Sequence, residues 1–252
     1  METNQLKPKL RVGIDVNEVL RARWLQFDRF YAQEFGDDEI TEATYIYDFY
    51  NGVYPFKETT EVIKELKEPE DMPDDINPLD YQLNEDGEAN ADFALFKTAK
   101  TKTLTAREVY NRFMYEDYVF EIHGNAPIMY RQMDLHVKEF YEKYRDTVEF
   151  TVFSKENDFS RPSTLFFLSK TLSRFPKYHF IETNDEVWNN VDVFITTDPE
   201  FLDLVPEGKM VIKLNRPYNE KSGKGSITPV LHIHDLFDNE EFEKIIKYNK
   251  PE

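Results

Sequence analysis

The chain has no cysteine among its 252 residues. This absence excludes disulfides, thiolate metal ligands and a cysteine nucleophile, and it is typical of a protein of the reducing cytoplasm. Long apolar runs are also missing. Residues 1–10 contain no stretch of signal-peptide length, and no window approaches the roughly 20 apolar residues that span a membrane. We therefore expect neither a standard secretion signal nor a membrane-inserted segment.

Positive charge is scarce in this sequence. Lysine and arginine together number 31 against 49 aspartates and glutamates, so the net charge is -18. Such a surface repels phosphate backbones and anionic lipid headgroups, so nucleic acid and membranes are not expected as direct partners. Aromatic residues, by contrast, are plentiful, with 21 phenylalanines and 15 tyrosines. They favour a large core or contacts with other protein chains, in an oligomer or a larger assembly.

The order of hydrophobic patterns predicts an α/β fold with a Rossmann-like, three-layer core. Residues 10–14 alternate in the manner of a strand and lead into Asp15. After residue 145, strand patterns alternate with helical patterns. The strand patterns cover 148–153, 178–181, 191–196, 210–214 and 230–233, and the helical patterns cover 162–175, 185–189, 199–205 and 235–248. This alternation is typical of a parallel sheet with helices on both faces.

The first strand is expected to join this sheet, which makes the core discontinuous, with residues 5–20 and 146–250. Residues 21–145 then form a mainly helical insertion after the first strand. Helical patterns in this part of the chain cover 18–35, 58–67, 105–118 and 128–144. Thr105 and Glu108 have the spacing of a capping box, and Pro127 precedes the last of these helices.

Two segments of the insertion have unusual compositions. Residues 68–92 are rich in acidic residues and proline and contain no basic residue. Because the segment lacks the spacing of an EF-hand, we expect a solvated, disordered-like stretch rather than a Ca²⁺ site. Residues 45–56 are dense in aromatic side chains, which form either the core of the insertion or a docking surface for another protein.

Polar side chains follow three of the predicted strands, at the edge where open parallel sheets bind ligands. They are Asp15 and Asn17 after the first strand, Ser154 and Lys155 after the second, and Thr196, Thr197 and Asp198 after the fourth. Taken alone, Asp15 could simply cap the helix that follows it. Together with the order of elements, however, RVGIDVNEVL (residues 11–20) resembles the first motif of the haloacid-dehalogenase-like superfamily, and specifically that of its 5'-nucleotidase branch.

This resemblance implies a phosphatase site beneath an inserted cap. In the family, one aspartate attacks phosphorus and forms an aspartyl phosphate, and a second aspartate acts as general acid and base. A hydroxyl holds the phosphate, a lysine or arginine balances its charge, and carboxylates bind Mg²⁺. By position, Asp15 matches the nucleophile, Ser154 the hydroxyl, and Lys170, in FFLSK, the cation. The insertion at 21–145 lies where the family has its cap.

The first motif departs from the family pattern at two positions. Asn17 takes the place of the second aspartate. An amide cannot exchange an acidic proton with a leaving group or water, and such help is worth roughly 10² to 10⁴ in rate. Glu18 replaces the usual glycine and is expected to crowd the turn beside Asp15.

The metal-binding motif also departs from the family. In FITTDP, Thr196 and Thr197 stand where the resemblance requires two carboxylates, and Mg²⁺ is usually held by at least one or two carboxylates. Asp198 or Asp203 could complete a metal site with Asp15 if the fourth strand ended later than predicted.

These departures favour a catalytically degenerate protein that requires no cofactor and has a structural or protein-interaction role. One alternative is a working Mg²⁺-dependent phosphohydrolase of the 5'-nucleotidase type. Another is a site that binds a phosphorylated ligand without turnover, for which only Lys155 and Lys170 offer positive charge nearby. The composition is also similar to that of proteins of crAss-like bacteriophages, in which such folds can serve as virion or tail components. The expected location is therefore the cytoplasm or a virion.

Two further motifs are assigned to ordinary structure. His232 and His234 lie two residues apart on a strand pattern, but they lack a third ligand, so packing or exposure is favoured over a metal site. The segment SGKGS (222–226) lacks the first glycine of a phosphate loop and is expected to be an exposed loop.

Overall fold

The computed structural model describes residues 9–35, 56–66, 96–172, 177–223, 227–236 and 239–248. The chain divides into two compact units, Met1–Tyr54 with Asn111–Glu252, and Pro55–Tyr110. This division differs from the predicted insertion at 21–145, because the helix α1 (Arg23–Phe35) and the described residues from 111 to 145 belong to the unit that contains the sheet. The acidic segment 68–92, and all of 45–56 except Phe56, lie outside the described residues.

The first unit is built on a six-stranded, fully parallel sheet. Its strands are β1 (Leu10–Asp15), β4 (Val148–Lys155), β5 (Tyr178–Ile181), β6 (Val193–Thr196), β7 (Met210–Leu214) and β8 (Ile227–Val230), in the order β5-β4-β1-β6-β7-β8. The chain starts at the centre, builds one side of the sheet, then returns and builds the other. This is the order of a Rossmann-like, doubly wound sheet, and it confirms the predicted fold class.

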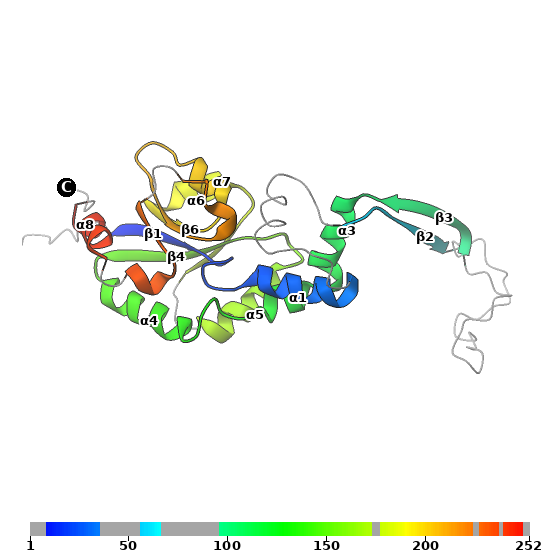
Figure 1. Cartoon of the computed structure of the whole chain (residues 1–252), viewed down its shortest axis with the longest axis horizontal. Coiled ribbons are helices and arrows are strands. Elements are labelled where there is room, and N and C mark those ends of the chain that lie inside the picture. The colour runs from blue at the N-terminus through cyan, green and yellow to red at the C-terminus, as the bar shows by residue number, and fades with distance from the viewer. Residues whose placement is uncertain are drawn as a thin grey trace, which may run out of the picture. The chain divides into compact units, whose positions relative to one another are not determined.

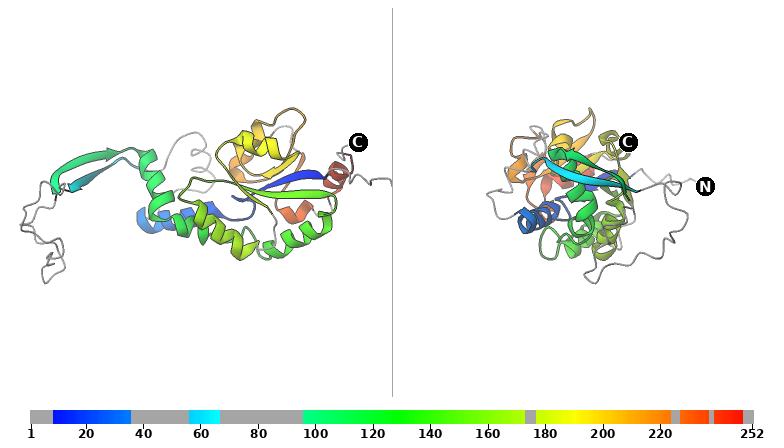
Figure 2. Two further views of the ribbon diagram at one scale, coloured as in Figure 1. Left: turned by 180° about the vertical axis from the view of Figure 1, so that it is seen from behind. Right: turned by 90° about the vertical axis from the view of Figure 1, so that its right-hand side faces the viewer.

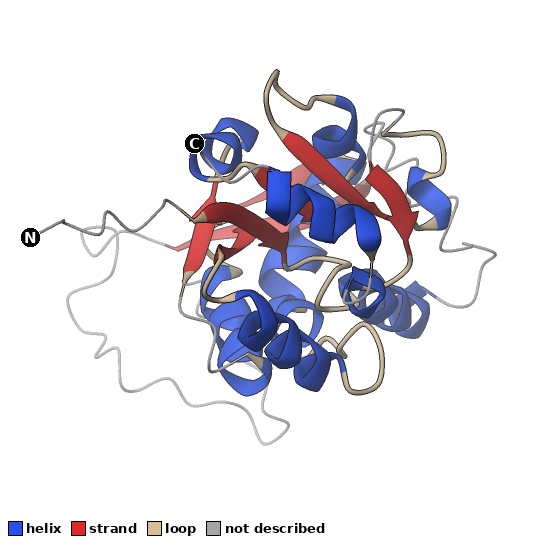
Figure 3. Ribbon diagram, turned by 90° about the vertical axis from the view of Figure 1, so that its left-hand side faces the viewer, coloured by secondary structure: helices blue, strands red, loops and turns tan. Residues whose placement is uncertain are grey.

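Helices cover both faces of this sheet, as Figures 1 and 3 show. On one face lie α4 (Met133–Tyr144), α5 (Arg161–Thr171) and α8 (Glu240–Tyr248), and on the other lie α6 (Asn184–Asn190) and α7 (Pro199–Asp203). Val12 and Ile14 of β1 pack with Phe140 of α4 on the first face. Phe194 of β6 packs with Trp188 of α6 on the second. Each fully buried side chain of this size contributes about 1.5–3 kcal/mol.

The second unit contains an antiparallel pair of strands, seen in Figure 2. The first of these strands occupies the residues for which a helix was predicted at 58–67. The strands are β2 (Thr59–Leu66) and β3 (Phe96–Leu104), paired from Thr59 opposite Leu104 onward. Residues 59–63 include several β-branched residues, which favour extended backbone. The expectation of a mainly helical insertion is therefore wrong for this unit.

The helix that follows β3 begins with the predicted capping box. Thr105 Oγ1 accepts a hydrogen bond from the backbone N–H of Glu108 at 3.3 Å, and Glu108 Oε2 accepts one from the backbone N–H of Thr105 at 2.9 Å. This pair satisfies two backbone donors at the start of α3 (Ala106–Arg112). Two π-helical turns follow in the first unit, η2 (Phe113–Asp117) and η3 (Phe120–Gly124).

The helix expected from residue 128 begins later, at Met133. The backbone of the intervening segment is used elsewhere: Pro127 O accepts a hydrogen bond from Ala22 N at 2.8 Å, and Met129 N donates to Leu20 O at 3.1 Å. These bonds hold the segment against the turn after β1. At the far edge of the sheet, the predicted strand 230–233 is likewise displaced, since β8 ends at Val230 and Ile233–Leu236 forms a 3₁₀ turn, η5.

Candidate functional site

The candidate site lies at the carboxyl ends of β1, β4 and β6, the central strands of the sheet. The chain passes from one side of the sheet to the other here, and open α/β sheets bind ligands at such a switch point. β1 ends at Asp15 and β6 ends at Thr196, whereas Ser154 is the penultimate residue of β4. The structure thus brings the predicted strand-end residues to one edge.

The carboxyl group of Asp15 is buried, and each of its oxygens accepts a hydrogen bond. Asp15 Oδ2 accepts a hydrogen bond from Thr196 Oγ1 at 2.7 Å, and Oδ1 accepts one from the backbone N–H of Asn17 at 3.1 Å. Burial raises the pKa of Asp15 to about 7, and the negative charge of Asp198 adds to that increase, while the two hydrogen bonds and Arg23 oppose it. A large share of this carboxyl group is therefore protonated at neutral pH.

Asp198 and Asp203, the two residues that could have completed a metal site with Asp15, each accept a backbone hydrogen bond. Because β6 ends at Thr196 as predicted, Asp198 is the N-cap of α7, where Oδ1 accepts a hydrogen bond from Glu200 N at 2.8 Å. Asp203 Oδ1 accepts one from Gly223 N at 2.8 Å. Within the described ranges, no group of three or more His, Asp or Glu side chains is placed to hold a metal ion. With hydroxyl groups at Thr196 and Thr197 and no third carboxylate grouped with Asp15 and Asp198 among the described residues, the residues present do not fit the Mg²⁺ site that the resemblance implies.

Glu18 occupies the turn after β1 in a left-handed conformation, with φ of 59°. A side chain is disfavoured there, which explains why the related motif has glycine. The carboxylate compensates by accepting a hydrogen bond from the backbone N–H of Trp24, in the first turn of α1, at 2.9 Å. Glu18 therefore links the turn to the helix that follows.

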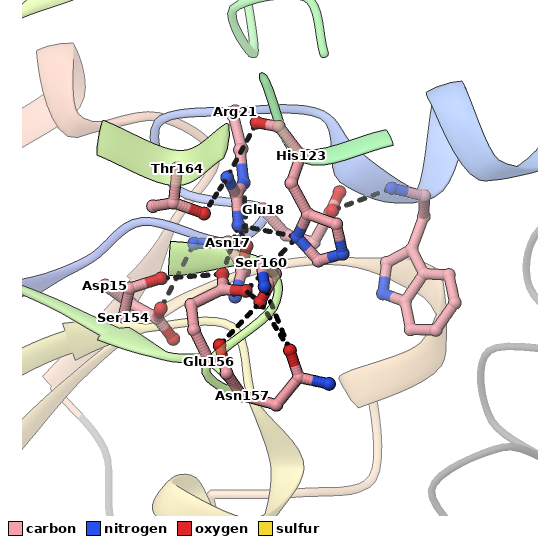
Figure 4. Close-up of polar contacts among 11 residues, drawn as sticks. Asp15, Asn17, Glu18, Arg21, His123, Ser154, Glu156, Asn157, Ser160 and Thr164 are labelled. Carbon is pink, nitrogen blue, oxygen red and sulfur yellow. Dashed lines mark hydrogen bonds and ion pairs between the residues drawn. The ribbon is translucent and has the colours of Figure 1, made fainter. Parts of the chain in front are cut away.

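A buried ion pair between Arg21 and Glu156 occupies the centre of the site (Figure 4). Both side chains are inaccessible to solvent, and Arg21 Nη2 donates to Glu156 Oε1. Asn17 Oδ1 accepts from Arg21 Nε at 2.9 Å and Nη2 at 2.7 Å. Arg21 Nη1 donates to Thr164 Oγ1 at 2.7 Å and to the backbone oxygen of His123 at 2.8 Å.

The same glutamate binds the hydroxyl group expected to hold a phosphate. Ser154 Oγ donates to Glu156 Oε1 at 2.8 Å, and Ser160 Oγ donates to Oε2 at 2.5 Å. Asn17 Nδ2 lies 3.5 Å from Oε1. Burial alone would raise the pKa of Glu156, but Arg21 and His123 outweigh it and hold that pKa well below the usual value. The carboxylate therefore stays charged.

His123, from η3, completes this cluster as a neutral side chain. Burial lowers its pKa to about 4, although Glu156 acts in the opposite direction. Its Nδ1 lies 3.2 Å from Glu156 Oε2 and 3.3 Å from Arg21 Nη2. The ring stacks on Tyr115 with centroids 5.5 Å apart. Among the described residues, its buried Nε2 has no hydrogen-bond partner.

Of the two predicted cations, Lys170 lies away from the site and Lys155, at the end of β4, faces the surface, while two arginines that were not predicted supply positive charge inside it. Lys170 is exposed near the end of α5, with its ammonium over the ring of Phe166, so the structure does not bring it to the site. Lys155 pairs with Glu200 at the surface, at 3.0 Å. Arg21 is fully buried in the cluster, and the charge of Arg23, also buried, lowers the pKa of Asp15. The expectation that only lysines supply positive charge was wrong.

Part of this cluster could have been found from the sequence. Arg21 and Glu156 follow the ends of β1 and β4 by a few residues, so opposite charges near the two strand ends were a usable signal. His123 gives no such signal, because it is 102 residues from Arg21 in the chain.

The histidine pair near the edge of the sheet takes part in ring packing. His234 stacks on His136 of α4 with centroids 4.2 Å apart, and His232 lies 4.5 Å from the ring of Tyr130. These contacts join the end of β8 to the region of α4.

The sequence matches no known family model, and it matches no curated protein. Among solved structures, the chain is similar to UDP-GlcNAc 2-epimerase from Neisseria meningitidis bound to UDP-GlcNAc, with a TM-score of 0.32 and 14% sequence identity. The match covers 54% of this chain and 34% of the epimerase, so the chain spans about a third of that protein. So low a score carries no argument, and the fold is assigned from the strand order. Among the described helices, none is long and apolar enough to cross a membrane.

Proposed function

We propose that this protein is a catalytically degenerate haloacid-dehalogenase-like protein with a structural or protein-interaction role and no required cofactor. One observation carries the proposal: the donors that a phosphate group would need are bound to the chain's own Glu156 carboxylate. Ser154 and Arg21 both donate to it inside a fully buried cluster. A phosphate dianion would have to displace a carboxylate paired with a buried cation, and breaking such a pair costs about 3–5 kcal/mol.

Two further features support the absence of phosphatase chemistry. Asn17 has no acidic proton to give, and its oxygen accepts two hydrogen bonds from Arg21. Asp15, the nucleophile implied by the resemblance, has a pKa raised to about 7 by burial, so it is only partly ionised at neutral pH. The carboxylate is the attacking form, so this shift reduces the fraction of the protein that could start the reaction at neutral pH.

The proposed interaction role is supported by apolar side chains on the surface of the first unit. Phe159, Leu204 and Leu231 are each more than half exposed to solvent. Exposed large apolar residues are common singly, but together with the aromatic-rich, acidic composition they favour contacts with other chains. A place in a bacteriophage virion or tail is the form of assembly that the composition suggests.

The catalytic part of the proposal is tested by phosphate release from p-nitrophenyl phosphate and nucleoside monophosphates in the presence of Mg²⁺. Wild type, Asp15→Asn and Asn17→Asp are compared. We expect no turnover above the Asp15→Asn background from wild type. Asn17→Asp alone is expected to remain inactive, because Arg21 would bind the new carboxylate. Nucleotide turnover by wild type that Asp15→Asn abolishes would establish the Mg²⁺-dependent phosphohydrolase instead.

The interaction part of the proposal is tested by multi-angle light scattering over a range of concentrations. We expect the mass to exceed that of one 30.1 kDa chain and to increase with concentration. Phe159→Ser is the matched surface variant, since Phe159 is exposed and its replacement is expected to leave the thermal midpoint unchanged. A wild-type chain that stays monomeric at all concentrations, and that captures no chain from its native assembly, would count against the role.

A further inference from the structure

We propose that the buried cluster around Arg21 is an oxyanion-binding site whose ligand in the native chain is the Glu156 carboxylate, and that a free carboxylate or phosphate takes that place when the side chain is removed. This inference uses contacts that also support the proposed function. It makes a separate claim, however, because it concerns binding by the cluster and not turnover.

The first argument is the convergence of donors on a single carboxylate. Ser154 and Ser160 donate hydroxyl hydrogens to its two oxygens at 2.8 and 2.5 Å, and Arg21 donates a guanidinium hydrogen. The amide nitrogen of Asn17 lies 3.5 Å away and Nδ1 of His123 lies 3.2 Å away. These groups come from the turn after β1, from β4, from the start of α5 and from η3. Such a shell of donors is the arrangement that binds carboxylates and phosphates in proteins.

The second argument is charge. Arg21 is fully buried and cannot lose its proton under ordinary conditions, so an anion beside it is required. His123 is uncharged at neutral pH and does not relieve that requirement. Removing Glu156 would take away the carboxylate that, among the described residues, hydrogen-bonds Arg21, and would leave the more distant charge of Glu18 to act on the buried cation.

A third observation concerns unused hydrogen-bonding capacity. His123 Nε2 is buried and, within the described part of the chain, has no partner. The carboxylate of Glu156 meets only the Nδ1 side of the ring. Because the ring is neutral and Nδ1 is the nitrogen that faces the carboxylate, Nε2 is an acceptor, so a water molecule bound to the oxyanion can donate a hydrogen bond to it.

The size of the ligand follows from the substitution. Glu156→Ala removes one methylene and the carboxylate, which is an acetate-sized group, and Glu156→Gly removes a propionate-sized group. Acetate and propionate are therefore the probes. Acetamide has the shape of acetate without its charge and serves as the neutral control.

The experiment measures the thermal midpoint, Tm, of wild type, Glu156→Ala and Glu156→Gln against acetate, acetamide and phosphate at constant ionic strength. We expect both variants to melt below wild type in chloride. Above the dissociation constant, each tenfold increase in acetate should raise the Tm of Glu156→Ala by about 3–5 °C. Glu156→Gln fills the space and should respond weakly, and acetamide should have no effect.

Several outcomes would overturn the inference. Equal responses of Glu156→Ala and wild type to acetate would mean a general salt effect, and a response to acetamide equal to that to acetate would mean simple cavity filling. If Glu156→Ala does not fold in chloride, refolding is repeated in acetate, and Glu156→Gly is refolded in propionate. Failure of both variants to fold with their probes would also refute the site. Phosphatase activity of wild type would refute the proposed function and leave this binding result unaffected.

Discussion

The carboxyl group of Asp15 couples the stability of the fold to pH. Its pKa rises from 3.8 to about 7 on folding, chiefly through burial. The folded state therefore binds this proton more tightly than the unfolded state does. The resulting stability is complete below about pH 4 and is lost as the pH rises toward 7. The loss is on the order of 2–4 kcal/mol.

We predict that Asp15→Asn stabilises the protein at high pH and not at low pH. Asparagine resembles the protonated acid, so variant and wild type should melt alike near pH 4. At pH 8, where Asp15 is ionised, the variant should melt about 4–16 °C higher. Thermal unfolding followed by circular dichroism from pH 4 to 8 measures the difference.

Asp192→Asn is the control, because folding shifts the pKa of Asp192 in the direction opposite to that of Asp15. Although burial acts to raise the pKa of Asp192, its hydrogen bonds and charge pairing with Arg11 lower it below 3.8. Asp192 therefore stabilises the fold above that pH, so its replacement should lower Tm by nearly the same amount from pH 4 to pH 8, with the loss shrinking only below about pH 4. A uniform Tm offset for Asp15→Asn at every pH would contradict the account of Asp15.

At the scale of elements, the side chains packed around β1 leave little room for a side chain at Gly13. A Cβ atom on Gly13 would lie 2.8 Å from both Phe194 Cδ2 and Val191 Cγ1, and 3.0 Å from Phe153 Cε2. These side chains belong to the core between the sheet and helices α6 and α7. Glycine at this position lets the neighbouring aromatic rings pack directly over the strand that carries Asp15.

We predict that Gly13→Ala destabilises the protein by about 1–3 kcal/mol, because close-packed cores tolerate added atoms poorly. Urea titration should show a lower midpoint with an unchanged slope. In a Phe194→Val background, where one crowding ring is gone, the same substitution should cost less. Equal costs in the two backgrounds would show that packing against Phe194 is not the cause.

At the scale of the whole molecule, the net charge of -18 opposes folding through self-repulsion. We predict that NaCl raises Tm steeply at low ionic strength and weakly above about 0.3 M, where the Debye length is only several ångströms. Thermal melts in a NaCl series, repeated in choline chloride, measure the effect. The gain should shrink at pH 5, where more carboxylates are protonated. A Tm that is independent of salt would show that the charges are compensated locally.

Most elements of the sheet could be predicted, and the second unit could not. The strands at Tyr178–Ile181 and Met210–Leu214 agree with the sequence patterns at both ends, since short apolar runs bounded by polar residues carry their own limits. Residues 59–66 carry apolar and charged side chains that fit a helix or a strand. Their partner, β3, begins about 30 residues later in the chain, and only pairing with it selects the strand.

The sequence by itself determined which functional groups the site has and which it lacks. It has an aspartate at the end of the first strand, an amide at Asn17 and hydroxyl groups at Thr196 and Thr197, and it has no thiol. These are properties of residue types, and they do not depend on how the chain folds.

Only the tertiary structure decided that Glu156 is the partner of Arg21, 135 residues away in the chain, and that Lys170 takes no part in the site. Strand order and helix packing bring distant side chains to one edge of the sheet, where burial removes water and leaves each charge with the partners in reach. Local patterns can place such charges near the ends of strands, but they do not determine which of them pair.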